Sequence, residues 1–245
     1  MEHKDYSYIE KNLRAIRENI ASAQQSSPYG GEVTLLLATK YATAEEMNAA
    51  ARYGVRDVGE NRVQQLLEKY DALDKENLNI HFIGQLQKNK VKYIVDKVCM
   101  IHSLDSVELA REIDRRCERI GRVMDVLIEI NIGEEDAKGG ISPSELESFY
   151  SEISGFSHIR VVGVMTMAPK CEKKEEFTKY FRETYAIFLD FCDKNLHNID
   201  RTVLSMGMSD SYTVAVSEGA TLVRVGRAAF VRPAEDDGAN LPANK

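Results

Sequence analysis

Residues 34–50 read TLLLATKYATAEEMNAA, and the pattern of this stretch changes in its middle. Residues 34–39 form an apolar run typical of a buried strand, whereas the pattern from Thr43 onward is helical, with a glutamate at the capping-box position. Lys40 therefore lies where a strand is followed by a helix. A charge at the carboxyl end of a parallel strand points into the mouth of an α/β fold, where ligands bind.

The same alternation continues along the chain. Seven more strand-like runs follow, at residues 56–61, 79–86, 99–104, 123–133, 159–167, 201–207 and 221–230. Helix-like segments lie between them, at residues 43–54, 62–73, 88–97, 105–121, 142–155 and 173–194. Eight strands alternating with helices predict an α/β fold, a single-domain (β/α)8 TIM barrel. A doubly wound open sheet is the alternative, because periodicity does not show closure.

The ends of the chain differ from the alternating part. Residues 1–32 are predicted to form an extra N-terminal helix, running to about Ala23, and a turn that packs on the barrel. Residues 33–231 are predicted to form the barrel, and residues 232–245 a polar C-terminal tail.

Composition narrows the class of protein. Of the 245 residues, 43% are hydrophobic and 29% charged, and the net charge is −7, as expected for an ordinary globular protein. Basic and acidic residues are interleaved, so nucleic acid is not an expected partner. We predict a cytoplasmic chain without a membrane segment, because no window is apolar enough to span a bilayer and the N-terminus is charged. The four scattered cysteines predict no metal site.

Two glycine-containing turns follow the last two predicted strands, SMGMSDS at residues 205–211 and VGRAA at residues 225–229. Phosphate sites of barrels recur in the loops after strands seven and eight. Strand one pairs with strand eight when a barrel closes, so Lys40 is expected beside these turns. A lysine amine near a phosphate site can attack a carbonyl, which indicates a sugar phosphate or pyridoxal 5′-phosphate as ligand.

Each of these residues also has a structural interpretation. Lys40 fits a solvated lysine or an ion-pair partner. Arg224 shares a strand face with Gly226, yet it also fits a salt bridge inside the barrel, with a residue such as Glu129 or Glu60.

Seven segments together resemble one protein family. They are LLLATKYAT at residues 35–43, GENRVQQL at 59–66, HFIGQLQKNK at 81–90, IHSLDS at 101–106, EINIGEEDAKGG at 129–140, VVGVMTMAP at 161–169 and LSMGMSDSYTVAVSEGATLVRVGRAAF at 204–230. In this order they resemble the pyridoxal-phosphate homeostasis proteins of the YggS/PROSC type. The resemblance implies a fold-type III barrel related to the N-terminal domain of alanine racemases, with pyridoxal phosphate bound as an internal aldimine.

The resemblance also implies roles for individual residues. Lys40 matches the lysine of the Schiff base, and Arg224 matches the arginine that faces the pyridine nitrogen. The phosphate is expected against Met208, Ser209, Gly226 and Arg227, with Ser205 close by.

Two further positions match the cofactor pocket of the family. They are Asn61 and Met165. Asn61 can also be explained as a buried asparagine that stabilises a turn, and Met165 as a residue packed in the barrel core. Arg227 replaces a small hydroxyl residue, and Gln85 replaces a histidine, so the roles at these two positions are open.

Three functions follow. The first is a carrier, buffer or regulator of pyridoxal phosphate, which supplies dependent apoenzymes and acts as a monomer. It fits because an arginine facing the ring weakens the electron sink and because no segment after strand eight supplies a racemase tyrosine. The second is a small amino-acid racemase, with Tyr41 as the nearby acid or base. The third is a Schiff-base enzyme of sugar phosphates.

Overall fold

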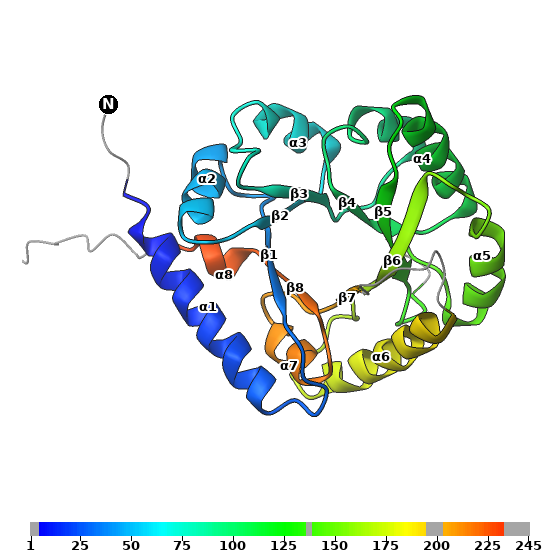
Figure 1. The fold of residues 1–245 in the computed structure, drawn as a ribbon. Coiled ribbons are helices and arrows are strands. Elements are labelled where there is room, and N and C mark those ends of the chain that lie inside the picture. The colour runs from blue at the N-terminus through cyan, green and yellow to red at the C-terminus, as the bar shows by residue number, and fades with distance from the viewer. Residues whose placement is uncertain (1–4, 136–138, 195–202, 233–245) are drawn as a thin grey trace, which may run out of the picture.

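Eight parallel strands close into a barrel in the computed structural model, which describes residues 5–135, 139–194 and 203–232. They are β1 Thr34–Ala38, β2 Asp57–Glu60, β3 Asn79–Phe82, β4 Met100–Leu104, β5 Met124–Ile130, β6 Ile159–Thr166, β7 Val203–Ser205 and β8 Leu222–Val225. Pairing of β8 with β1 closes the ring (Figure 1). The predicted (β/α)8 barrel is therefore confirmed, and the open sheet is excluded.

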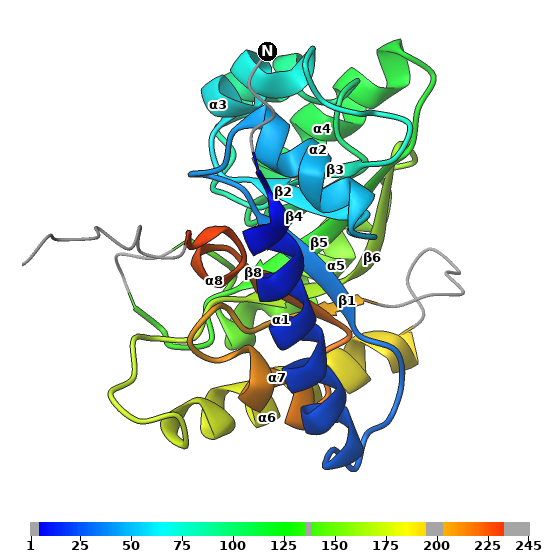
Figure 2. The ribbon, with the colours of Figure 1, turned by 90° about the vertical axis from the view of Figure 1, so that its left-hand side faces the viewer.

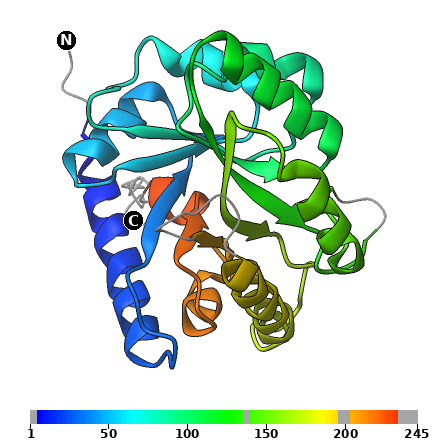
Figure 3. The ribbon, with the colours of Figure 1, turned by 45° about the vertical axis from the view of Figure 1, so that its right-hand side comes forward.

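Helices surround the strands, as Figures 1 and 3 show. They are α1 Ser7–Gln25, α2 Ala44–Arg52, α3 Val63–Tyr70, α4 Val107–Arg119, α5 Leu146–Ile153, α6 Glu176–Lys194, α7 Tyr212–Ser217 and α8 Arg227–Phe230, with 3₁₀ helices η1 Lys88–Tyr93 and η2 Pro143–Glu145. The predicted capping box of α2 is present, since Thr43 Oγ1 accepts from the Glu46 N–H and Glu46 Oε2 accepts from the Thr43 N–H. None of the helices in the described ranges could cross a membrane.

The apolar core has two parts. A small cluster fills the barrel interior and consists of Leu36, Ile83, Leu127, Val162, Met165, Val203 and Leu222. A larger cluster lies between the strands and the surrounding helices. Strands buried on both faces explain why the strand segments read as continuous apolar runs.

Helix α1 lies on the outside of the barrel, along α7 and α8 (Figure 2). Its buried residues recur every three or four positions, as an amphipathic helix requires, and include Ile9, Leu13, Ile16 and Ile20. Asn12 Nδ2 donates to the carbonyl oxygens of Ala229 and Val231. The division of the chain at residues 32 and 232 stays a prediction.

Two elements differ from the sequence-based expectation. The helix expected at residues 88–97 is only the 3₁₀ helix η1. The strand expected at 221–230 ends at Val225, and α8 begins at Arg227. The chain turns at Gly226, where a Cβ atom would lie 2.9 Å from the carbonyl oxygen of Ala38. Residues 201–202 of the expected seventh strand, and residues 233–245 of the expected tail, lie outside the described residues.

Candidate functional site

A cavity of about 590 Å³ lies at the carboxyl ends of the strands. Its lining comes from the ends of β1, β2, β3, β6, β7 and β8 together with α2 and α8. The lining residues are Ala38, Lys40, Tyr41, Glu46, Asn61, Ile83, Met167, Met208, Ser209, Asp210, Arg224, Gly226, Arg227, Phe230 and Val231. This is the end of a (β/α)8 barrel where binding sites are found.

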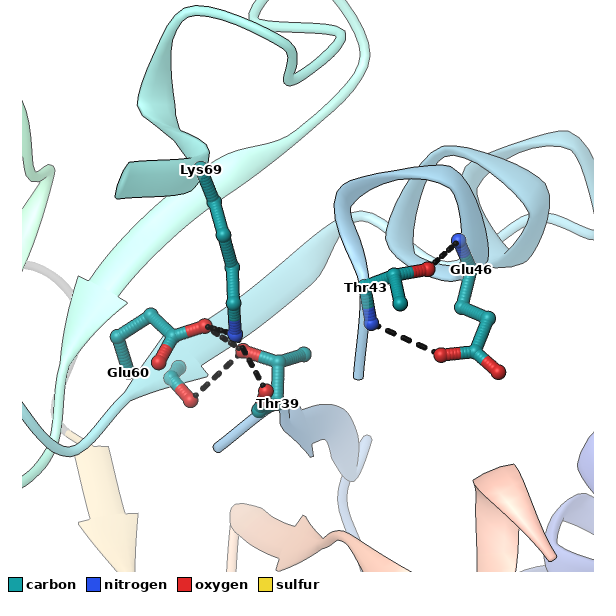
Figure 4. Close-up of polar contacts among 6 residues, drawn as sticks. Thr39, Thr43, Glu46, Glu60 and Lys69 are labelled. Atoms are coloured by element: carbon teal, nitrogen blue, oxygen red, sulfur yellow. Dashed lines mark hydrogen bonds and ion pairs between the residues drawn. The ribbon is translucent and has the colours of Figure 1, made fainter. Parts of the chain in front are cut away.

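The backbone that carries Lys40 is fixed by a buried cluster of polar groups (Figure 4). Thr39 Oγ1 donates to Glu60 Oε1 at 2.7 Å. Lys69 Nζ donates to the same Glu60 oxygen at 2.8 Å and to the Thr39 carbonyl oxygen at 2.9 Å. These bonds join the end of β1 to the end of β2, so we call Thr39, Glu60 and Lys69 the β1–β2 clamp.

The Lys40 side chain is exposed, in contrast to its buried neighbour Thr39. Its Nζ lies 4.8 Å from the centre of the Tyr41 ring, which is 77% exposed. Asn61, which follows the neighbouring strand β2, has a buried Oδ1 without a hydrogen-bond partner in the described part of the chain. A buried acceptor of this kind is rare, and it is available to a polar ligand that enters the cavity.

Arg224 is the buried cation of the site, only 4% exposed. Its Nη1 donates to Ser205 Oγ at 2.6 Å and its Nη2 to the Thr166 carbonyl oxygen at 2.9 Å. Burial lowers the pKa of Arg224 to about 10, against the opposing charge of Glu129. The guanidinium is therefore still charged at neutral pH. Glu60, the other acid considered for Arg224, is paired with Lys69.

Glu129 on β5 is buried close to Arg224. Burial raises its pKa to about 7, and the Asp105 carboxylate adds to this effect, while Arg224 opposes it. The Glu129 carboxyl is consequently poised to change charge near neutral pH.

The turns after β7 and β8 lie against each other. Gly207 has a φ of +88°, and a Cβ atom there would lie 2.5 Å from the Cβ of Ala215, so only glycine fits this turn. Ser209 Oγ accepts from the Gly226 N–H at 3.3 Å. Arg227, on the exposed side, pairs with Asp210 at 3.1 Å. The two turns bring hydroxyl, guanidinium and backbone N–H groups to one wall of the cavity.

The structure brings most of the residues selected from the sequence into this cavity, namely Lys40, Asn61, Met208, Ser209, Arg224, Gly226 and Arg227. Ser205 and Met165 are not among the lining residues. Ser205 lies beneath Arg224 and is fully buried, and Met165, 1% exposed, belongs to the barrel interior.

Several lining residues were not expected from the sequence. Met167, two residues after Met165, reaches the mouth because it follows the last residue of β6. Position relative to the strand end would have identified it. Glu46 and Phe230 belong to helices. The capping box marks Glu46 as a residue of a helix start, but no local pattern marks either residue as part of the cavity lining.

The fold and site define a class, the single (β/α)8 barrels with a lysine and a buried arginine at the carboxyl end of the strands. Residues 11–233 match the family model of the alanine racemase N-terminal domain. The pyridoxal phosphate homeostasis protein of Aquifex aeolicus is 39% identical over 221 residues, which are 90% of this chain and 96% of that one. The chain thus belongs to the family of pyridoxal phosphate homeostasis proteins, as the resemblance predicted.

One solved structure agrees with this assignment, and a more distant one shows the same fold. PipY of Synechococcus elongatus with pyridoxal phosphate bound has a TM-score of 0.78 and 30% identity, over 91% of this chain and 100% of that one. An alanine racemase of Clostridium difficile shares the fold, with a TM-score of 0.65 and 16% identity, over 93% of this chain and 61% of that one.

Proposed function

We propose that this protein binds pyridoxal 5′-phosphate and acts as its carrier, buffer or regulator rather than as a racemase. The observation that carries the proposal is that an exposed amine, Lys40, and a buried guanidinium, Arg224, line the same cavity. The PLP-bound relative PipY and the names of the curated relatives support the choice of ligand.

The residues present fit this cofactor. The orphaned Asn61 Oδ1 and the glycine at position 226, where a Cβ atom would meet the Ala38 carbonyl oxygen, mark a cavity shaped for a polar ligand close to the backbone. Lys40 would hold the aldehyde, and Ser209, Gly226 and Arg227 would hold the phosphate. When bound, pyridoxal phosphate supplies an aldehyde and an electron-withdrawing ring.

Arg224 limits what the site can catalyse. A cationic donor facing the ring nitrogen favours the unprotonated nitrogen and so disfavours carbanion chemistry. Ser205 and Thr166 fix both terminal nitrogens of this guanidinium, so it stays in the cavity wall. Such a site stores a reactive aldehyde without activating it strongly. We infer hand-over to dependent apoenzymes by a monomer as the physiological role.

The first experiment is the visible spectrum of the purified protein, incubated with pyridoxal phosphate, before and after borohydride, followed by peptide mass analysis. We expect a yellow protein that bleaches and a pyridoxyl mass on the Lys40 peptide. Lys40→Ala should lose the covalent attachment, and with it the pyridoxyl mass fixed by borohydride, whereas Lys88→Ala, which changes an exposed lysine of η1, should keep it. No band in the parent would contradict the proposal and favour a sugar-phosphate enzyme.

Other lysines and other activities are tested by the same preparation. A pyridoxyl mass on Lys92 of η1, or on Lys138, which lies outside the described residues, would move the anchor from Lys40. Racemisation of amino acids well above the rate of free cofactor would favour the racemase, with Tyr41 as the acid or base. Arg224→Glu should raise the proton affinity of the ring and increase such side activity.

A further inference from the structure

A line of polar side chains crosses the barrel interior behind Arg224. Ser205 Oγ, which accepts from Arg224 Nη1 at 2.6 Å, lies 3.4 Å from His102 Nδ1. His102 Nε2 lies 3.0 Å from His81 Nδ1. His81 Nε2 in turn lies 3.1 Å from Asp57 Oδ1. The line therefore joins the candidate site to the first residue of β2.

The polar line is almost completely buried. Ser205 and His102 are 0% exposed, and His81 and Arg224 are 4% exposed. The interior of a (β/α)8 barrel is normally filled by branched apolar side chains, and a buried polar group destabilises the fold unless it is hydrogen-bonded. Apolar packing alone does not account for two adjacent buried histidines.

The far end of the line reaches a second cavity. Asp57 is part of the lining of a cavity of about 420 Å³ between α1 and the amino ends of β1 and β2, together with Arg17 and Arg56. The Asp57 side chain is 21% exposed. One end of the polar line is thus accessible to solvent, and the other forms the wall of the candidate site.

The spacing of the two imidazoles constrains their protons. At 3.0 Å, one N–H must lie between His102 Nε2 and His81 Nδ1. If the pair carries an extra proton, His81 donates to both Asp57 and His102, and the Nδ1–H of His102 faces Ser205. If the pair is neutral, His102 donates to His81, and the Ser205 hydroxyl donates to His102 Nδ1. Loss of one proton to solvent therefore exchanges donor and acceptor in the His81–His102 and His102–Ser205 hydrogen bonds. His81 Nε2 donates to Asp57 in both states, and all heavy atoms keep their partners.

The surrounding charges decide which arrangement is present. Burial lowers the pKa of His81, but Asp57 on β2 and Cys99 before β4 outweigh it and raise that pKa to about 9. Burial, His81 and Arg224 hold the pKa of His102 well below its usual range. Arg224 itself faces Glu129. At neutral pH the extra proton consequently resides on His81.

We propose that Asp57, His81, His102 and Ser205 form a positioning relay, which fixes Arg224 from behind and transmits a change of charge at the amino end of the barrel to the candidate site. In the protonated relay, Ser205 Oγ accepts from both His102 and Arg224. In the neutral relay it accepts from Arg224 alone, which strengthens the Arg224–Ser205 bond. For the cofactor, which rests on the proposed function, the protonated relay adds positive charge behind the arginine and further disfavours a protonated ring nitrogen.

The relay is tested first on the full chain without cofactor, by NMR of ¹⁵N-labelled imidazole and guanidinium groups against pH. We expect His81 to lose a proton near pH 9, with His102 changing from the Nδ1–H to the Nε2–H tautomer at the same midpoint. The Arg224 Nε–H resonance should move with that midpoint. A His102 that keeps one tautomer, or an Arg224 resonance that does not follow His81, would overturn the proposal.

Matched variants separate the relay from a purely structural role. Asp57→Asn should lower the midpoint of His81, His102 and Arg224 together by about 1 to 2 pH units. Asp125→Asn, at the start of β5 and paired with the exposed Arg160, should leave all three midpoints unchanged. Ser205→Ala should stop the Arg224 resonance from following the histidines. An unchanged midpoint in Asp57→Asn contradicts the relay.

A second readout uses the loaded protein. The visible absorbance of bound pyridoxal phosphate should change with pH at the midpoint that NMR gives for His81, and Asp57→Asn should lower both midpoints equally. An absorbance change that ignores Asp57→Asn would show that the relay does not reach the cofactor. If the parent binds no cofactor, the proposed function fails, and the NMR measurements still decide on the relay.

Discussion

Glu129 shows how one side chain near the site makes stability depend on pH. Its pKa of about 7 in the folded protein compares with an ordinary value of 4.5, because the carboxyl is buried and faces Asp105. Between these two pH values the folded state holds a proton that the unfolded chain has lost. The free energy of unfolding therefore falls as the pH rises from 4.5 to 7, by up to about 3 kcal/mol.

Glu129→Gln should remove this dependence, because the amide resembles the protonated acid. We expect the variant to equal the parent in stability below pH 4.5 and to exceed it by about 1 to 3 kcal/mol at pH 8. Urea unfolding at both pH values measures the difference. Glu118→Gln, on the exposed face of α4, serves as the control with no change. A less stable Glu129→Gln at pH 8 would show that Arg224 needs the carboxylate.

Gly226 is a second single residue on which the site depends. A Cβ atom there would lie 2.9 Å from the Ala38 carbonyl oxygen, so Gly226→Ala must shift the turn after β8 or the end of β1. We expect at least a tenfold weaker retention of pyridoxal phosphate, about 1.4 kcal/mol, measured by equilibrium dialysis. Gly155→Ala, where no atom lies within 4 Å of the added carbon, should bind as the parent does. Equal affinities would place the phosphate elsewhere.

At the scale of elements, the N-terminus of α2 supports one wall of the cavity. Its capping box satisfies two backbone N–H groups and fixes Glu46, which lines the cavity. Thr43→Ala should lower the free energy of unfolding by about 1 kcal/mol, because it removes the acceptor for the Glu46 N–H. Thr43→Ser keeps that acceptor and should lose much less. Urea unfolding of both variants checks this, and equal losses would argue against the cap.

The sequence predicted the elements whose local pattern agrees with their tertiary role. The stretch around Lys40 is the clearest case, since a buried strand, a strand-end charge and a capping box all appear within residues 34–50. The prediction of an α-helix at residues 88–97 was wrong, because the Asn, Tyr, Val and Ile residues of this segment favour the α-helix only weakly and tertiary packing produces a 3₁₀ helix instead.

The site was predictable where a residue follows a strand end and not where contacts cross the barrel. Lys40 and Ser209 lie in loops that the topology brings together. The relay could not be predicted, because His81 and His102 are 21 positions apart and meet only when β3 and β4 point them inward. Phe230 lines the cavity because the chain turns at Gly226. The sequence pattern of this segment predicted a continuous strand and therefore did not predict the turn.

At the scale of the whole molecule, Glu46 joins parts of the chain that are far apart. Glu46 Oε1 accepts from the Tyr8 hydroxyl of α1 at 2.6 Å and from Arg232 Nη2 at 2.9 Å. Tyr8→Phe should lower the free energy of unfolding by about 1 kcal/mol and loosen α1. Hydrogen exchange of the α1 amides should increase in this variant and not in Tyr6→Phe. Unchanged exchange would show that apolar contacts alone hold α1.

The β1–β2 clamp fixes the backbone next to Lys40 and leaves the Lys40 side chain free to move. Glu60 and Lys69 hold the backbone before Lys40. The amine of Lys40, by contrast, is at the end of a side chain of four methylene groups that is exposed to solvent. A ligand that captures the amine therefore restricts side-chain rotors only, about 2 kcal/mol, and not the backbone as well. Capture is entropically easy for this reason, and a released Lys40 regains its freedom without any rearrangement of the strands.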